Sequence, residues 1–131
     1  MKVLLSIKPE FVEQITNGNK KFEYRKKIFK EEVDTVVVYS NMPVGKLVGE
    51  FKIGTIIKGT PEEIWKQTYP NAGVPEDFFR SYFSNREEAF AIEIKDFKAY
   101  PEPLDPKEVF GRFTAPQSYM YIEDTEIPYN T

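Results

Sequence analysis

The sequence predicts an α+β domain in which a small mixed or antiparallel β-barrel is flanked by helices. Three observations support this class. Patterns typical of strands outnumber those typical of helices, short turns join consecutive strands, and 131 residues fit one compact domain. We expect this domain to cover residues 1–122 and a polar, acidic C-terminal tail to follow over residues 123–131.

The first part of the chain predicts a strand, a helix and a second strand. Val3–Ile7 is a short apolar run typical of a strand, and Pro9 suits the first turn of a helix. Asn17 and Gly18 favour the end of that helix. Between residues 21 and 27, apolar or aromatic side chains alternate with charged ones, which predicts a strand with one charged face.

The middle of the chain predicts two more strands and two helices. The β-branched run at 36–38 favours a buried strand, and turn-forming residues at 41–45 connect it to a strand over 47–57. Thr60 begins a capping box that opens a short helix. Residues 78–83 carry four aromatic side chains at helical spacing, which favours packing of a second helix into the core over a surface platform for bases.

The last part of the chain predicts one regular strand and then an irregular return. Residues 89–97 alternate cleanly, as in a strand with one apolar face. Pro101, Pro103 and Pro106 are expected to interrupt the chain after it. Residues 117–122 predict a final short extended piece. The expected order is therefore β-α-β-β-β-α-α-β, followed by a loop-rich return.

Composition limits the chemistry that the side chains can supply. The chain contains no cysteine and no histidine, which excludes disulfides and cysteine nucleophiles and removes the commonest general base and metal ligand. We therefore expect no metal and no cofactor. The absence of cysteine also favours a cytoplasmic location. No apolar run approaches the roughly 20 residues of a membrane span, so we expect no membrane partner.

Charge is distributed unevenly along the chain, whose net charge is −3. Residues 1–60 hold 11 basic and 7 acidic side chains, whereas residues 61–131 hold 7 basic and 14 acidic ones. The acidic total argues against non-specific coating of nucleic acid. A local basic patch is still predicted, because six basic side chains fall within eleven residues: Lys20, Lys21, Arg25, Lys26, Lys27 and Lys30.

The densest functional motif is residues 18–25, which read Gly-Asn-Lys-Lys-Phe-Glu-Tyr-Arg. A strand places Glu23 and Arg25 on one face, and Lys20 lies in the turn before it, so three charged groups converge. An arginine held by a glutamate offers a fixed fork of donors to phosphate or a base edge. A desolvated lysine can act as a base or nucleophile. The alternative is an exposed salt bridge worth about 0–1 kcal/mol.

The pattern G-x-K-x-x-E-x-R at residues 18–25 resembles the signature of the ASCH domain family, which has the PUA-like fold. Four further pieces are similar to that family: Ser6–Pro9, Tyr39-Ser40, Val48–Phe51 and Pro116–Tyr121. The resemblance extends over nearly the whole chain up to Ile122. It implies a PUA-like barrel with a ligand cleft beside the signature.

The resemblance also implies an RNA- or nucleotide-binding module that acts in RNA metabolism or translation regulation, with RNA, a nucleotide or a nucleoside as partner. Lys8, Lys20 and Arg25 would hold phosphate. Tyr39 and the piece from Gln117 onward would contact a base. The expected ligand-binding residues are Lys8, Lys20, Glu23, Arg25, Tyr39, Ser40, Gln117, Ser118 and Tyr119.

Two alternatives stay open, and the first is a hydrolase that uses Lys20 on a modified nucleoside or RNA. One branch of the family hydrolyses acetylated cytidine with a lysine, a threonine three residues on and a distant glutamate. Lys20 fits the lysine, but Glu23 stands at the threonine position and residues 71–73 hold no acid where the glutamate would fall. Recognition is therefore favoured over that hydrolysis, whereas ribonuclease activity stays open. The second alternative is a protein-interaction domain, and a homodimer also stays open.

Overall fold

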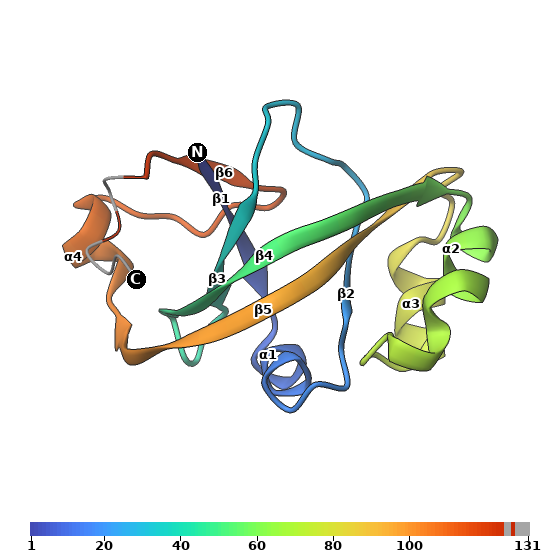
Figure 1. The fold of residues 1–131 in the computed structure, drawn as a ribbon, viewed down its shortest axis with the longest axis horizontal. Coiled ribbons are helices and arrows are strands. Elements are labelled where there is room, and N and C mark those ends of the chain that lie inside the picture. Colours follow the sequence, from blue (N-terminus) through green and yellow to red (C-terminus); the bar gives the residue numbers. More distant parts are fainter. Residues whose placement is uncertain (125–126, 128–131) are drawn as a thin grey trace.

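The computed structural model describes residues 1–124 and 127, and its centre is a six-stranded mixed sheet (Figure 1). The strands are β1 (Lys2–Ile7), β2 (Phe22–Arg25), β3 (Thr35–Ser40), β4 (Lys46–Gly59), β5 (Ala89–Leu104) and β6 (Met120–Ile122). The helices are α1 (Pro9–Thr16), α2 (Pro61–Thr68), the 3-10 helix η1 (Tyr69–Asn71), α3 (Glu76–Tyr82) and α4 (Pro106–Phe110). The expected order β-α-β-β-β-α-α-β is confirmed up to β5, with η1 inserted between the two expected helices α2 and α3.

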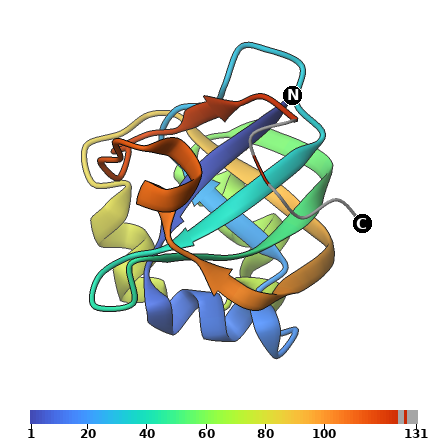
Figure 2. The ribbon, with the colours of Figure 1, turned by 90° about the vertical axis from the view of Figure 1, so that its left-hand side faces the viewer.

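The sheet has the strand order β2-β5-β4-β3-β1-β6, and every pairing except that of β1 with β3 is antiparallel. α1 connects β1 to β2, and the long strands β4 and β5 cross the molecule side by side (Figure 1). The sheet curls strongly (Figure 2). Within the described residues its two edge strands, β2 and β6, are not paired with each other. The mixed α+β class is confirmed, but the expected closure into a barrel is not.

The core lies on both faces of β1 and β3, because alternate side chains of these strands point in opposite directions. Val3 and Leu5 join a cluster with Phe51 and Ile92 on one face, whereas Leu4 belongs to a second cluster on the other. All six residues of β3 are buried. The β-branched run therefore lies in a central strand covered on both faces, as the sequence predicts.

α2 and α3 lie together at one end of the sheet (Figure 1). The capping box at Thr60 is confirmed: its hydroxyl accepts a hydrogen bond from the Glu63 amide at 3.2 Å, and the Glu63 carboxylate accepts one from the Thr60 amide at 2.9 Å. Phe79 and Phe83 pack into a third core cluster with Tyr24 of β2. This third cluster fixes α3 against the strand that carries the charged motif.

β5 continues through Pro101 and Pro103 to Leu104, so the expectation that these prolines interrupt the strand was wrong. The reason lies in the neighbouring strands. β2 pairs with β5 only over Phe90–Glu93, and the proline-bearing part of β5 has β4 as its strand partner. A strand whose other side has no partner accommodates proline, because the missing N–H leaves no ladder bond unmade.

α4 was not expected from the sequence. Asp105 caps it by accepting a hydrogen bond from the Lys107 amide at 2.9 Å, and Pro106 occupies the first turn. None of the helices in the described part of the chain is long and apolar enough to cross a membrane. Most of the expected acidic tail, residues 125–126 and 128–131, lies outside the described residues.

Candidate functional site

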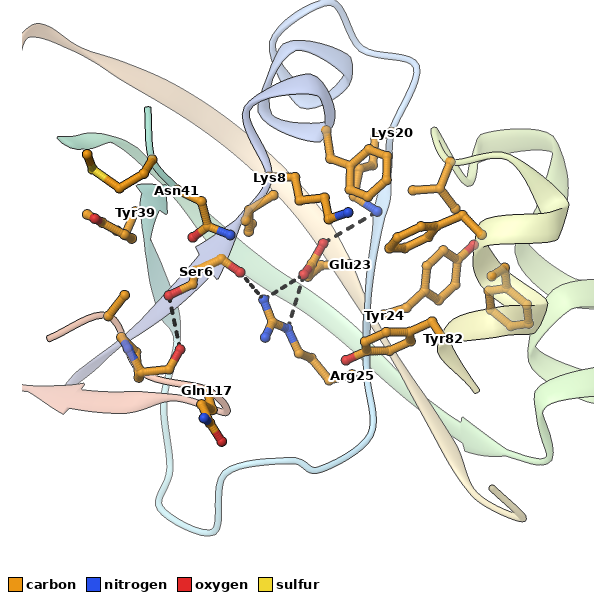
Figure 3. Close-up of a pocket in the computed structure, with 18 residues that line it drawn as sticks. Ser6, Lys8, Lys20, Glu23, Tyr24, Arg25, Tyr39, Asn41, Tyr82 and Gln117 are labelled. Atoms are coloured by element: carbon orange, nitrogen blue, oxygen red, sulfur yellow. Dashed lines mark hydrogen bonds and ion pairs between the residues drawn. The ribbon is translucent and has the colours of Figure 1, made fainter. Parts of the chain in front are cut away.

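A cavity of about 650 Å³ opens beside the charged motif (Figure 3). Its walls come from the end of β1, from α1, β2 and α3, from the turn between β3 and β4, and from the loop before β6. The motif residues Lys20, Glu23 and Arg25 all line it. The predicted convergence of these three side chains is therefore observed, and they lie at the bottom of a cavity and not on an open surface.

Lys20 is almost completely buried, with 2% of its surface exposed. Its ammonium group donates to the carbonyl oxygens of Phe22 at 2.6 Å and Ala72 at 3.3 Å, and it lies 3.4 Å from the Glu23 carboxylate. Burial lowers the pKa of Lys20, and the neighbouring Glu23 opposes this shift. All three N–H donors of the ammonium thus face an acceptor.

Close approach of η1 and the residues after it produces this burial. The Lys21 amide donates to the Asn71 carbonyl at 2.9 Å, which aligns the two segments. Gly73, at φ +65°, lies so close that a Cβ atom there would be 2.6 Å from the Lys20 Cα and would overlap the Lys20 side chain. Glycine is therefore required at position 73 by both its backbone conformation and its contact with Lys20.

Arg25 is held on several sides. Its Nε donates to Glu23 Oε2 at 3.0 Å, and its Nη2 lies 2.8 Å from the same oxygen. Nη2 also donates to the Ser6 carbonyl at 2.7 Å, and Nη1 donates to the Ser118 carbonyl at 3.4 Å. The guanidinium therefore connects β2 to β1 (Figure 3) and, through the Ser118 carbonyl, to the loop before β6.

Aromatic rings form the wall of the cavity on the side of α1 and α3. Phe11 and Phe78 meet edge to face with ring centroids 4.8 Å apart, and Phe78 lies nearly parallel to Tyr82 with centroids 6.1 Å apart. Tyr24 also faces the cavity, with the Lys20 ammonium 4.9 Å from its ring centroid. Burial raises the pKa of the Tyr82 phenol above its usual value.

Polar side chains with unused hydrogen-bonding capacity lie at the other side and the rim. Asn41 lines the cavity opposite Tyr24 and Tyr82 (Figure 3), and within the described part of the chain its carboxamide makes no hydrogen bond. Lys8 extends into the cavity with its ammonium 5.0 Å from the Phe78 ring centroid. Gln117 is exposed at the rim.

The nine expected ligand-binding residues occupy different places. Six of them line the cavity: Lys8, Lys20, Glu23, Arg25, Tyr39 and Gln117. Ser40 is buried at the end of β3, and Ser118 meets the site through its backbone carbonyl. Tyr119 packs edge to face against Phe29 and Tyr121, away from the cavity lining.

The sequence favoured core packing for the aromatic side chains at 78–83, which holds for the buried Phe79 and Phe83, whereas Phe78 and Tyr82 are only partly buried and line the cavity. Asn41 was not expected in the site. Phe78 and Tyr82 are one helical turn apart, and the buried pair Phe79 and Phe83 follows the same spacing one residue later. The two adjacent pairs together give the helix a wide apolar face, and the sequence shows this width. The sequence assigned Asn41 only to a turn, because neighbouring residues do not reveal which side chain of a turn points into a cavity.

The described residues contain no group of three or more His, Cys, Asp or Glu side chains that could hold a metal ion. Glu23 is the acid that lines the cavity, and both its oxygens already meet Lys20 or Arg25. The chemistry of this site therefore consists of cations, aromatic faces, hydroxyls and amides.

A family model for the ASCH domain matches residues 5–98. The chain belongs to the ASCH domain family. The match covers the charged motif and the strands and helices that build most of the cavity. An ASCH domain-containing ribonuclease from Zymomonas mobilis is 28% identical over 128 residues, which cover 95% of this chain and 86% of that protein.

Solved structures show the same architecture. The crystal structure of ASCH from Zymomonas mobilis matches with a TM-score of 0.88 and 26% identity, over 95% of this chain and 90% of that chain. The N-terminal domain of McrB from Staphylothermus marinus matches with a TM-score of 0.60 and 11% identity, over 94% and 88% of the two chains. The McrB domain shares the fold alone.

Proposed function

We propose that this ASCH domain binds RNA and holds a nucleotide of it in the cavity. The observation that carries the proposal is the pairing of an aromatic wall with a lysine that has no carboxylate partner. Phe11, Phe78 and Tyr82 offer ring faces and edges to a base, and Lys8 extends over the Phe78 ring. Bases stack on such aromatic side chains, and lysines neutralise the phosphates between them.

In this proposal the charged motif shapes the cavity, and other residues make the main contacts with the ligand. Lys20 and Arg25 bond mostly to backbone carbonyls and Glu23, so they form a rigid positive floor. Lys8 holds a phosphate, and the carboxamide of Asn41 meets the edge of the base. An amide offers one donor and one acceptor side by side, which suits the paired polar groups of a base edge.

Binding of labelled single-stranded RNA, followed by fluorescence anisotropy at increasing salt, tests the proposal. We expect the affinity to fall as salt rises, because lysine–phosphate contacts release counterions. Phe78→Leu should weaken binding about tenfold through lost stacking, and Lys8→Gln should weaken binding and flatten the salt dependence. Lys66→Gln, on α2 outside the cavity lining, is the charge control. RNA affinity that is unchanged in both Phe78→Leu and Lys8→Gln would contradict the proposal.

A second candidate is cleavage of the bound RNA, and the similarity to the Zymomonas mobilis ribonuclease favours it. RNA can be cleaved by attack of its own 2′-hydroxyl on the adjacent phosphorus. The 2′-hydroxyl gives up its proton as its oxygen bonds to phosphorus, the P–O5′ bond breaks, and the leaving 5′ oxygen takes up a proton, which yields a 2′,3′-cyclic phosphate and a 5′-hydroxyl. Such a reaction needs proton transfer and neutralisation of phosphate charge, for which the cavity offers tyrosine hydroxyls and Lys8.

End-labelled RNA and the same sequence with 2′-deoxyriboses distinguish binding from cleavage. A ribonuclease of this kind cuts the RNA, leaves cyclic phosphate ends and spares the deoxy substrate, and Lys8→Gln slows it. Intact RNA after long incubation with protein that binds it tightly would reject this candidate and leave the binding function in place.

Hydrolysis through Lys20 has less support. Residues 71–73 do lie against Lys20, where the resemblance locates the glutamate of the acetylcytidine hydrolases, but they hold no acid. The Lys20 ammonium already has three acceptors around it, and Glu23 binds it at the threonine position. We therefore assign Lys20 to the support of the cavity and not to attack on a substrate.

A further inference from the structure

The partly exposed face of α3 carries the same arrangement twice. The Lys8 ammonium lies 5.0 Å from the ring centroid of Phe78, and the Lys26 ammonium lies 4.5 Å from that of Tyr82. The two rings are one helical turn apart, with centroids 6.1 Å apart and planes inclined by 12°. Each unit thus contains one aromatic ring and one cation, and the planes of the two rings are nearly parallel.

The two lysines reach α3 from different parts of the chain. Lys8 immediately precedes α1, and Lys26 immediately follows β2. Within residues 1–124 and 127, neither ammonium forms an ion pair with a carboxylate. Both charges are therefore available to an incoming anion, in contrast to Lys20, whose ammonium is saturated by neighbours.

The units differ in their relation to the cavity. Phe78 and Lys8 both line it, whereas Tyr82 lines it and Lys26 lies outside the lining. The second unit consequently continues the first from the cavity onto the outer surface along α3. A ligand that used both units would be longer than a single nucleotide and would leave the cavity at Tyr82.

We propose that α3 binds two consecutive nucleotides of a single RNA strand, one at each ring–lysine unit. This inference rests on the proposed RNA-binding function and names its ligand as a strand, in preference to a free nucleoside or mononucleotide. A base stacks on each ring, and the lysine now over that ring moves to the adjacent phosphate. Repeated aromatic rings along a basic path are how single strands are bound without a duplex.

Calorimetric titration with the four nucleoside 5′-monophosphates and the matching 5′-phosphorylated homodinucleotides tests this inference. We expect at least one dinucleotide to bind about tenfold or more tightly than its monophosphate, since base–aromatic stacking typically contributes that much. Lys26→Gln should reduce dinucleotide affinity toward that of the monophosphate and leave monophosphate affinity unchanged, because Lys26 lies outside the cavity lining. Tyr82→Leu should reduce dinucleotide affinity by a larger factor than monophosphate affinity. Tyr82→Phe should retain the dinucleotide affinity, because it keeps the ring.

Lys27→Gln provides the matched control for Lys26→Gln, because it removes the same charge from the next, exposed residue. Melting temperatures show whether Tyr82→Leu still folds. Equal affinity for a dinucleotide and its monophosphate would overturn the inference and leave the proposed function standing. Equal losses for both ligands in the Tyr82→Leu variant would also overturn it. No binding of any nucleotide or RNA would count against the proposed function itself.

Discussion

Arg25 Nη2 donates a 2.7 Å hydrogen bond to the carbonyl oxygen of Ser6, and this bond connects β2, at one edge of the sheet, to β1. β6 pairs with β1 only over Lys2–Leu4, so the backbone of Ser6 has no strand partner on that side. The Arg25 side chain therefore connects the edge strand β2 to the part of β1 that lies beyond its pairing with β6. The arginine of the charged motif is therefore part of the architecture of the cavity.

Arg25→Lys tests this structural role. Lysine keeps the positive charge but lacks the fork that reaches Glu23 and the Ser6 carbonyl together. We expect the free energy of unfolding, measured by urea denaturation, to fall by about 2–4 kcal/mol, because a buried ionic network loses its geometry. Arg80→Lys is the control, since Arg80 pairs with Glu62 and Glu76 at the surface, and its loss should be clearly smaller. Equal losses would contradict the role of Arg25.

Gly73→Ala tests the contact that buries Lys20. The variant suffers both the strain of a positive φ and the overlap with Lys20. Gly18→Ala has a positive φ of +86° but nothing within 4 Å of its Cβ, so it isolates the conformational cost, about 1–2 kcal/mol. We expect Gly73→Ala to lose at least a further 1–3 kcal/mol in urea denaturation, as overpacking does. If the two variants lose the same, the close approach is not a constraint.

Stability at high pH depends on Tyr24, because burial raises the pKa of its phenol from 10.0 to about 12. Between these values the unfolded chain releases the proton and the folded chain keeps it, so stability falls as the pH rises. At pH 11 the loss from this one group is about 1 kcal/mol. Tyr82 and Tyr100, whose pKa values are also raised by burial, contribute losses of the same sign.

Tyr24→Phe removes the Tyr24 contribution. The variant loses the 2.7 Å hydrogen bond to Thr68 at every pH, which lowers stability by about 1 kcal/mol at neutral pH. Its further loss between pH 8 and pH 11 should be about 1 kcal/mol smaller than that of the unmodified protein. An identical pH dependence in the two proteins, followed by chemical denaturation, would show that Tyr24 titrates alike in the folded and unfolded chain.

Asn41→Ala tests whether the cavity distinguishes one base from another. The backbone of Asn41 bonds to Ile7, Val44 and Gly45 and is unaffected by the change, so the turn should persist. We expect differences in affinity among short A, C, G and U homopolymers to shrink about tenfold, because the carboxamide supplies the base-edge contacts. Asn19→Ala, an exposed amide outside the cavity lining, should leave them unchanged. If the Asn41→Ala variant keeps the same affinity differences among the four homopolymers, Asn41 does not recognise the base.

The parts of the fold that sequence reasoning predicted are those determined by neighbours in the chain. The capping box at Thr60 and the β-branched run in β3 are local signals, and both are confirmed. α4 also has a local signal, because Asp105 can cap a helix and Pro106 suits its first turn. This signal was not used, since Pro106 was expected to interrupt regular structure. The continuation of β5 through Pro101 depends on which strands lie beside it, and that is a property of the sheet and not of the segment.

The charged residues of the candidate site were predictable from the sequence, whereas its aromatic wall was not. The spacing of Glu23 and Arg25 places both on one face of a strand, and they do meet. Lys20 was expected at the mouth of a turn, but it is buried because Gly73, distant in sequence, packs against it. The aromatic wall depends on how α3 is rotated against β2. This rotation is determined by the packing of Phe79 and Phe83 against Tyr24 in the third core cluster, which joins residues distant in sequence.

Photo-crosslinking of RNA that contains 4-thiouridine, followed by mass spectrometry of the crosslinked peptides, tests the central claim most directly. An unlabelled competitor RNA distinguishes specific crosslinks from incidental ones. We predict competed crosslinks in the peptides that carry Asn41 and the segment from Phe78 to Tyr82, since these residues line the cavity. Crosslinks confined to peptides that carry exposed lysines such as Lys27 and Lys30, with none in the cavity, would contradict the account.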